Sequence, residues 1–178
     1  MGNIFDSIKR KRTKVIMVGL DAAGKSTIAN RIGAKFENET QHPRIYTPGH
    51  RTWGEIEFVC WDLGGQPKFK LLWKSYLPDS KGIVFVFNSV DKEEDRIELA
   101  KSELAWLLEQ SPLAGLPLLV LANKQDLEGA MSVAEVAEKL GLDKIADRKW
   151  HVQGTTYKNK QSVIDGFDWL KKSMARVG

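Results

Sequence analysis

The segment Gly19–Ser26 constrains the fold of this chain more than any other part of the sequence. It reads Gly-Leu-Asp-Ala-Ala-Gly-Lys-Ser and matches the pattern GxxxxGK[ST], directly after the apolar run 14–18 and at the start of a helical stretch. A strand, loop and helix of this kind form a P-loop, in which backbone N–H groups and the helix N-terminus bind phosphate. The plain alternative is a glycine-containing turn without a ligand, which this context disfavours.

Each position of this loop has an expected role. Backbone N–H groups are expected to face the phosphates, the Lys25 amine to supply a cation to the β- and γ-phosphates in binding and catalysis, and the Ser26 hydroxyl to ligate Mg²⁺. The expected nucleotide contacts in this segment are Asp21, Ala22, Ala23, Gly24, Lys25, Ser26 and Thr27.

Apolar runs of about five to seven residues alternate with amphipathic stretches of about ten or more, which indicates an α/β fold with a mostly parallel sheet flanked by helices. Ligands of such sheets bind beyond the carboxyl ends of the strands. We expect strands over residues 14–18, 55–61, 82–87, 118–122 and 150–153, an edge strand between residues 45 and 53, and helices over 25–35, 91–110, 133–140 and 163–175.

Local signals mark several helix ends. Ser132 with Glu135 predicts a capping box at one helix start, and Gly141 predicts the end of that helix. Ser162 with Asp165 predicts a second capping box at the start of the last helix.

Length and charge limit the classes of function. The 178 residues favour one domain, and the formal net charge of +4 is accounted for by one basic run, Lys9, Arg10, Lys11 and Arg12. No basic face remains for nucleic acid. No stretch approaches the roughly 20 apolar residues of a membrane-spanning helix. We therefore expect a cytoplasmic monomer with an amino-terminal arm at residues 1–13 and one nucleotide-binding domain at residues 14–178.

A second motif selects the nucleotide. Asn123-Lys124-Gln125-Asp126 has the form NKxD and follows an apolar strand. The Asp126 carboxylate can accept hydrogen bonds from N1–H and the exocyclic amine of guanine, whereas adenine presents the opposite pattern at its ring nitrogen. Asn123 is expected to brace the loop, and the Lys124 stem to cover the base plane. Together with the P-loop, this motif favours GTP or GDP and opposes a P-loop kinase or ATPase.

The third motif is Asp62-Leu63-Gly64-Gly65-Gln66, after another apolar strand. Asp62 is expected to bind Mg²⁺ through water, the Gly65 N–H to meet the γ-phosphate, and Gln66 to orient the attacking water. In isolation, an ordinary turn that contains aspartate would be the preferred interpretation of this segment.

These motifs together resemble those of the Arf family of small GTPases. The segments GLDAAGKST, WDLGGQ, LANKQDL and the opening MGNIF are similar to that family's, and the spacing agrees over nearly the whole chain. The resemblance implies a six-stranded sheet, slow GTP hydrolysis, reversible membrane attachment, and work with exchange factors, activating proteins and effectors. It also makes Gly154-Thr155 the fifth nucleotide-contacting loop. No arginine is clearly positioned in the sequence as an arginine finger in cis, so we expect slow turnover without an activating protein.

The sequence departs from the family between residues 39 and 53. A Pro-Thr pair normally supplies a threonine to Mg²⁺ and the γ-phosphate there, but Pro43 is followed by Arg44 in this chain. The ligand is therefore displaced to Thr47, which we favour, or to Thr40, or it is absent. A GTP-binding module with impaired hydrolysis is the corresponding alternative function.

Three aromatic residues recur at matching intervals. Tyr46, Trp61 and Tyr76 match by spacing an aromatic triad that Arf-like proteins expose to effectors in the GTP state. Exposed aromatic anchors suit a recognition surface. Burial of these rings in the core is an equally good explanation.

The amino-terminal arm has the pattern of an interfacial membrane anchor. Ile4, Phe5 and Ile8 share one side of a short helix, and the basic run 9–12 follows them. Gly2 invites N-myristoylation, although Asp6 stands where that motif prefers serine or threonine. A solvated basic tail that docks on the body is the alternative.

Overall fold

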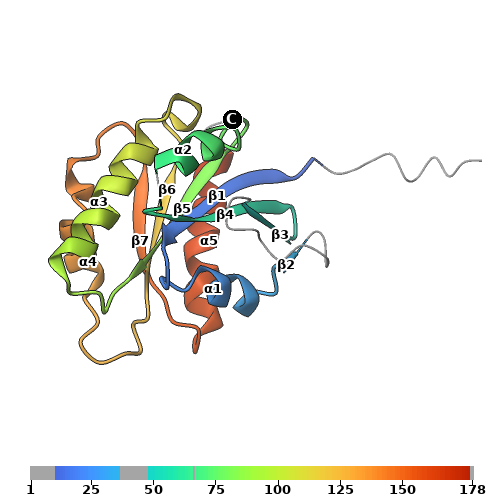
Figure 1. Ribbon diagram of the computed structural model, residues 1–178. Coiled ribbons are helices and arrows are strands. Elements are labelled where there is room, and N and C mark those ends of the chain that lie inside the picture. The colour runs from blue at the N-terminus through green and yellow to red at the C-terminus, as the bar shows by residue number, and fades with distance from the viewer. Residues whose placement is uncertain (1–10, 37–47, 66, 177–178) are drawn as a thin grey trace, which may run out of the picture.

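The computed structural model describes residues 11–36, 48–65 and 67–176, which form a sheet with helices on both faces (Figure 1). The sheet has seven strands in the order β2-β3-β4-β1-β5-β6-β7. The strands are β1 (Thr13–Leu20), β2 (Lys35–Phe36), β3 (Gly49–Trp53), β4 (Ile56–Leu63), β5 (Gly82–Asn88), β6 (Leu118–Asn123) and β7 (Trp150–Gly154).

The expected α/β P-loop class and mostly parallel sheet are confirmed. Strands β4, β1, β5, β6 and β7 run parallel, while β3 pairs antiparallel with β4, and β2 pairs antiparallel with β3. The two-residue β2 adds a short edge strand to the six that the family resemblance implied. Strand β1 begins at Thr13, so regular structure starts one residue before the expected domain boundary.

Among the described residues, five α-helices and two short 3₁₀ helices lie between or after the strands. Helix α2 was not predicted, because only Trp73 among its eight residues is buried and its apolar pattern is therefore weak. The helices are α1 (Lys25–Arg31), α2 (Pro67–Lys74), α3 (Glu94–Leu108), η2 (Ser111–Leu113), α4 (Val133–Lys139), η3 (Leu142–Lys144) and α5 (Lys160–Ala175).

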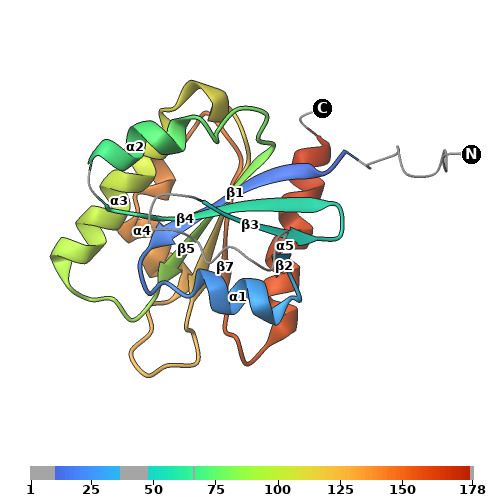
Figure 2. The ribbon, with the colours of Figure 1, turned by 45° about the vertical axis from the view of Figure 1, so that its right-hand side comes forward.

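Helices α1 and α5 cover one face of the sheet, and α2, α3 and α4 cover the other (Figures 1 and 2). Successive side chains of a strand point to opposite faces, so Val15 and Met17 join one core while Ile16 and Val18 join the other. The last six residues of β1 are all buried. Burial on both faces explains why the central strands read as continuous apolar runs.

The predicted helix ends are partly confirmed. The Ser132 side chain accepts a hydrogen bond from the Glu135 N–H, and Gly141 has the left-handed conformation (φ 69°) just after α4. The prediction for the last helix is wrong, because α5 begins at Lys160 and the side chain of Asn159 caps it by accepting from the Ser162 N–H. An asparagine three residues earlier competes successfully with a serine for the same role.

The carboxyl ends of the parallel strands meet at one edge of the sheet. Gly19 of β1 lies opposite Asp62 of β4, and Ala122 of β6 lies opposite Gly154 of β7. The motifs that the sequence places after separate strands are thereby neighbours. At the opposite edge, a cavity of about 780 Å³ is lined by Thr13, Trp53, Gly54, Glu55, Ile56, Lys81, Leu116, Lys171, Met174 and Ala175.

Candidate nucleotide-binding site

The P-loop requires glycine at two positions. Gly24 has φ 101°, and a Cβ there would collide with the side-chain nitrogen of Asn123. A Cβ on Gly19 would collide with the carbonyl oxygen of Val86 in the neighbouring strand. Ala22 also has positive φ, at 60°. The loop is therefore a tight turn packed against two strands, and it leads directly into α1, whose exposed first residues include Ser26 and Thr27.

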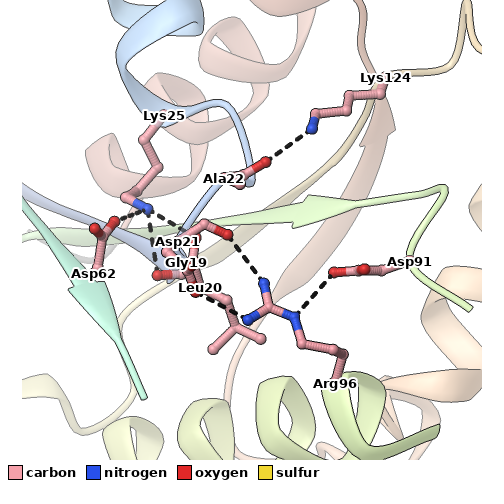
Figure 3. Close-up of polar contacts among 9 residues, drawn as sticks. All are labelled: Gly19, Leu20, Asp21, Ala22, Lys25, Asp62, Asp91, Arg96 and Lys124. Atoms are coloured by element: carbon pink, nitrogen blue, oxygen red, sulfur yellow. Dashed lines mark hydrogen bonds and ion pairs between the residues drawn. The ribbon is translucent and has the colours of Figure 1, made fainter. Parts of the chain in front are cut away.

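Lys25 holds the first part of the loop from within. Its Nζ donates hydrogen bonds to the carbonyl oxygens of Leu20 (3.0 Å) and Gly19 (3.3 Å). The same amine forms an ion pair with Asp62 at the end of β4 (Figure 3). Lys25 is half-buried and Asp62 is exposed. The cation expected to contact the phosphates thus lies between the loop and the third motif.

The next three carbonyls of the loop are held by side chains from other elements. A trans peptide points its C=O and the following N–H in opposite directions, so carbonyls that are bound from outside turn the N–H groups of Ala22 and Gly24 inward. Such inward N–H groups suit an anionic ligand. Arg96 Nη2 donates to Asp21 O at 3.0 Å, Lys124 Nζ to Ala22 O at 2.8 Å, and Asn123 Nδ2 to Ala23 O at 3.0 Å.

The donor set beside the loop fits Mg²⁺. The Ser26 hydroxyl lies on the first turn of α1, and the Asp62 carboxylate contacts the amine of Lys25, the residue before Ser26. Hydroxyl and carboxylate oxygens, completed by phosphate oxygens and water, are the ligands that Mg²⁺ prefers. Within residues 11–36, 48–65 and 67–176, no group of three or more His, Cys, Asp or Glu side chains could hold a metal ion by itself.

The NKxD segment, Asn123–Asp126, is called the base loop below. It is joined to the fifth loop, Gly154-Thr155, through buried contacts. Thr155 is fully buried, and its Oγ1 donates to Asn123 Oδ1 at 3.1 Å. The Gln125 N–H donates to the Thr155 carbonyl at 3.1 Å, and the Gln125 side chain lies beside Gly154. Asn123 therefore braces the P-loop with its amide nitrogen and the fifth loop with its amide oxygen.

Two residues that the sequence did not single out hold Asp126. Thr156 Oγ1 donates to Asp126 Oδ1 at 2.8 Å, and Lys158 Nζ lies 3.4 Å from Asp126 Oδ2. The hydrogen bond from Thr156, supported by Lys158, holds the pKa of Asp126 below its ordinary value. The carboxylate is consequently charged and oriented at neutral pH. The only sequence signal for Thr156 was its place directly after the fifth-loop pair.

Comparison with protein-family models matches residues 1–174 to the ADP-ribosylation factor family. The chain belongs to the ADP-ribosylation factor (Arf) family. Its members are small GTPases that bind GTP and GDP, generally with Mg²⁺, hydrolyse GTP, and act in membrane trafficking with exchange factors, activating proteins and effectors. The P-loop, the third motif and the base loop of this Arf-family protein all lie at the sheet edge that such a ligand would occupy.

Sequence reasoning missed one arginine of this Arf-family protein, which binds the P-loop from α3. Arg96, in the first turns of α3, donates from Nη1 to Asp21 Oδ1 at 2.9 Å and from Nε to Asp91 Oδ2 at 3.5 Å. The hydrogen bond from Arg96 holds the pKa of Asp21 below its ordinary value. No local pattern signals this contact, because Arg96 and Asp21 are 75 positions apart.

The aromatic triad of this Arf-family protein is only partly described. Trp61 is buried, and its ring stacks on Trp73 of α2 with centroids 5.8 Å apart. Tyr76 is half-buried, 6.2 Å from the His50 ring. In this conformation Trp61 belongs to the core and does not offer a free ring, because β4 turns its side chain towards α2. Gly65 is exposed at the end of the third motif.

Several predicted residues lie outside the described part of the chain. Lys11 and Arg12 are described and exposed, directly before β1. The predicted residues that lie outside are Gln66, Thr40, Tyr46, Thr47, Gly2, Ile4, Phe5, Ile8, Lys9 and Arg10. Among the described helices of this Arf-family protein, none is long and apolar enough to cross a membrane.

Proposed function

We propose that this Arf-family protein is a two-state switch that binds GTP with Mg²⁺, hydrolyses it slowly to GDP, and couples these states to membrane recruitment of effectors. The observation that carries the proposal is the hydrogen bond from Asn123 Nδ2 to the Ala23 carbonyl, 3.0 Å long. It holds the base-reading loop at a set distance from the phosphate-binding loop. This contact between the two loops supports a ligand that carries both a guanine and a polyphosphate.

The catalytic roles follow from the placement of the motifs. Lys25 would exchange its loop and Asp62 contacts for the β- and γ-phosphates, and the Gly65 N–H would meet the γ-phosphate. Gln66 would orient a water for attack on the γ-phosphorus. The bond between that phosphorus and the bridging oxygen would break, which leaves GDP and phosphate. Ser26 and Thr47 directly, and Asp62 through water, would hold Mg²⁺, which when bound would supply positive charge to the phosphates.

Guanine specificity rests on Asp126. A carboxylate has about four lone-pair sites, so Asp126 can keep its contacts to Thr156 and Lys158 and still accept two hydrogen bonds from guanine. Lys124 reaches the Ala22 carbonyl, so its stem spans the gap between the base loop and the phosphate loop. That position is compatible with the stem covering one face of the base.

We propose that the arm at residues 1–13 attaches the protein reversibly to the cytoplasmic face of a membrane. The apolar side chains Ile4, Phe5 and Ile8 and the basic run 9–12 would lie at the interface, with or without a myristoyl group on Gly2. The cavity of about 780 Å³ beside Thr13 supports a docked state of the arm. Movement of the β3–β4 hairpin, whose tip at Gly54 lines that cavity, would release the arm in the GTP state.

The second candidate function is a GTP-binding module with impaired hydrolysis. It is favoured by one observation, the replacement of the family's Pro-Thr pair by Pro43-Arg44. Loss of that threonine would weaken closure over the γ-phosphate. The aromatic residues Tyr46, Trp61 and Tyr76 would act as an effector surface in either case, after a rearrangement that exposes Trp61.

Nucleotide affinity and single-turnover hydrolysis with and without Mg²⁺ test these functions. We expect the native chain to bind GTP and GDP, and Thr47→Ala and Gln66→Leu to slow hydrolysis about 10- to 100-fold. Gln161→Leu, on the exposed surface of α5, is the matched control and should turn over normally. Tight GTP binding without turnover in the native chain would support the binding module instead. Failure to bind guanine nucleotide would reject both.

A further inference from the structure

We propose that Arg96 is a positioning residue that sets the preference of the site for GTP over GDP, by acting on Asp21. This inference rests on the proposed function and deepens it. Arg96 lies on α3, outside the motifs of the nucleotide site, and reaches the third residue of the P-loop (Figure 3). A positioning role is inferred because its guanidinium is bound to protein groups and not aimed at the phosphates.

The guanidinium of Arg96 is held on three sides. Its Nη1 and Nη2 donate to the Asp21 carboxylate (2.9 Å) and to the Asp21 carbonyl (3.0 Å), and its Nε donates to Asp91 at 3.5 Å. The planar guanidinium has two parallel N–H donors, which can bind the side-chain and backbone oxygens of one residue at the same time. A lysine amine has no such fork. Asp91 anchors the fork from the opposite side, so Arg96 bridges the P-loop and the segment before α3.

The backbone contact orients a phosphate-binding group. The Asp21 carbonyl and the Ala22 N–H belong to one trans peptide and point in opposite directions. When Arg96 binds that carbonyl on the α3 side, the Ala22 N–H turns towards the interior of the loop. Ala22 has positive φ, at 60°, so this peptide is held in a sparsely populated conformation that needs outside support.

The side-chain contact controls a negative charge. The Asp21 side chain is 72% exposed and sits in a loop whose expected ligand is a triphosphate. A free carboxylate at this position would repel the γ-phosphate, which GTP has and GDP lacks. Arg96 holds the carboxylate towards α3 and compensates its charge, so the penalty on GTP is reduced. Because the γ-phosphate is the group affected, loss of Arg96 should lower the affinity for GTP more than the affinity for GDP.

The experiment measures Mg²⁺-dependent affinities for GDP and for a non-hydrolysable GTP analogue in the full chain. The variants are Arg96→Ala, Arg96→Lys, Asp21→Asn and the double variant Asp21→Asn/Arg96→Ala. We expect Arg96→Ala to lower the affinity for the GTP analogue about tenfold and the affinity for GDP about threefold or less, as for loss of a partly exposed charge-assisted pair. Arg96→Lys should shift the ratio in the same direction by a smaller factor, because it keeps the charge and loses the fork.

The double variant separates charge control from general loop support. Removal of the Asp21 charge should return the ratio of the two affinities to within about twofold of the native value even without Arg96. The matched control is Glu94→Gln, which breaks the exposed 3.6 Å ion pair with Lys139 at the start of the same helix and should leave the ratio unchanged.

Each other outcome rejects the proposal. Equal loss of both affinities in Arg96→Ala, or a ratio that stays shifted in the double variant, would mean that Arg96 only supports the loop. If Arg96→Ala fails to fold, the proposal is rejected when Arg96→Lys has the native ratio of GTP-analogue to GDP affinity. Native affinity and turnover are measured first, so normal GTP binding with an unshifted ratio rejects the role of Arg96 alone, and absent binding rejects the proposed function as well.

Discussion

Asp126 shows how a single residue is oriented for the guanine-binding role that we propose for it. Its pKa is lowered chiefly by the hydrogen bond from Thr156, with Lys158 adding to the effect. A carboxyl group with a lowered pKa contributes binding or stability that is fully present above its ordinary pKa and is lost only as the pH falls through the lowered value. Guanine recognition by Asp126 should therefore be constant across the neutral pH range.

We expect Thr156→Ala to change the acid side of the pH profile for GDP binding. Without the Thr156 hydroxyl, the pKa of Asp126 rises towards its ordinary value, so affinity is lost at a higher pH than in the native chain. At neutral pH the loss of a fixed orientation of Asp126 should lower the affinity for GDP by about threefold. The measurement is GDP affinity between about pH 3 and 7. Thr156→Ser keeps the hydroxyl and should follow the native profile; identical profiles for alanine and native would contradict the assignment.

At the scale of elements, helix α2 is attached to α3 by a buried ion pair. Lys70 Nζ lies 2.9 Å from Glu103 Oε1, whose side chain is only 8% exposed, and also lies over the Trp106 ring at 4.8 Å. The other oxygen, Glu103 Oε2, is buried without a hydrogen-bond partner among the described residues. Since α2 directly follows Gln66, this attachment also limits where the third motif can move.

Removal of Lys70 should therefore lower the free energy of unfolding more than removal of an ordinary surface lysine. Lys70→Ala leaves the Glu103 carboxylate buried and unpaired, and we expect a loss of about 2–3 kcal/mol in the free energy of unfolding. Urea denaturation would measure it. Lys74→Ala, exposed on the same helix, should cost less than about 0.5 kcal/mol. Lys70→Met/Glu103→Leu should recover most of the loss, and a double variant as unstable as Lys70→Ala would show that the pair itself stabilises the fold.

At the scale of the whole molecule, the P-loop and the start of β1, where the arm joins the sheet, lie at opposite edges of the sheet. The chain enters β1 at Thr13 beside the large cavity, while the P-loop begins where β1 ends. A rigid parallel sheet joins the two edges. All the P-loop contacts described above come from residues at or after Gly19, so the arm is expected to act on the nucleotide site only through the β3–β4 hairpin.

Deletion of residues 1–10 tests this coupling. We expect the shortened chain to bind GDP more weakly than the native chain, because a docked arm would favour the GDP state. We also expect it to lose binding to vesicles that contain phosphatidylserine, since it lacks the apolar and basic side chains of the arm. Co-sedimentation with vesicles and GDP titration would measure the two properties. Lys9→Gln/Arg10→Gln keeps the apolar side chains and should weaken only the charge-dependent part. Unchanged vesicle binding after the deletion would reject the membrane role of the arm.

Sequence reasoning succeeded where residues near each other in the chain determine the structure. The buried strands were located to within a few residues, and the Ser132 cap formed as predicted, because both depend on local patterns. Helix α2 was missed because its pattern is weak, and Asn159 displaced Ser162 as a cap because two local signals competed. Trp61 faces the core in this structure, which spacing could not decide because it depends on the packing of α2 against β4.

The sequence by itself determined the α/β class and predicted the P-loop and the guanine-binding motif, because glycine placement, donor chemistry and apolar periodicity are properties of contiguous residues. Only the tertiary structure decided which side chains hold the P-loop from outside. Asn123 reaches Ala23 across 100 positions, and Arg96 reaches Asp21 across 75. These partners meet because parallel strands bring their carboxyl ends to one edge of the sheet and α3 starts beside it, which no local pattern encodes.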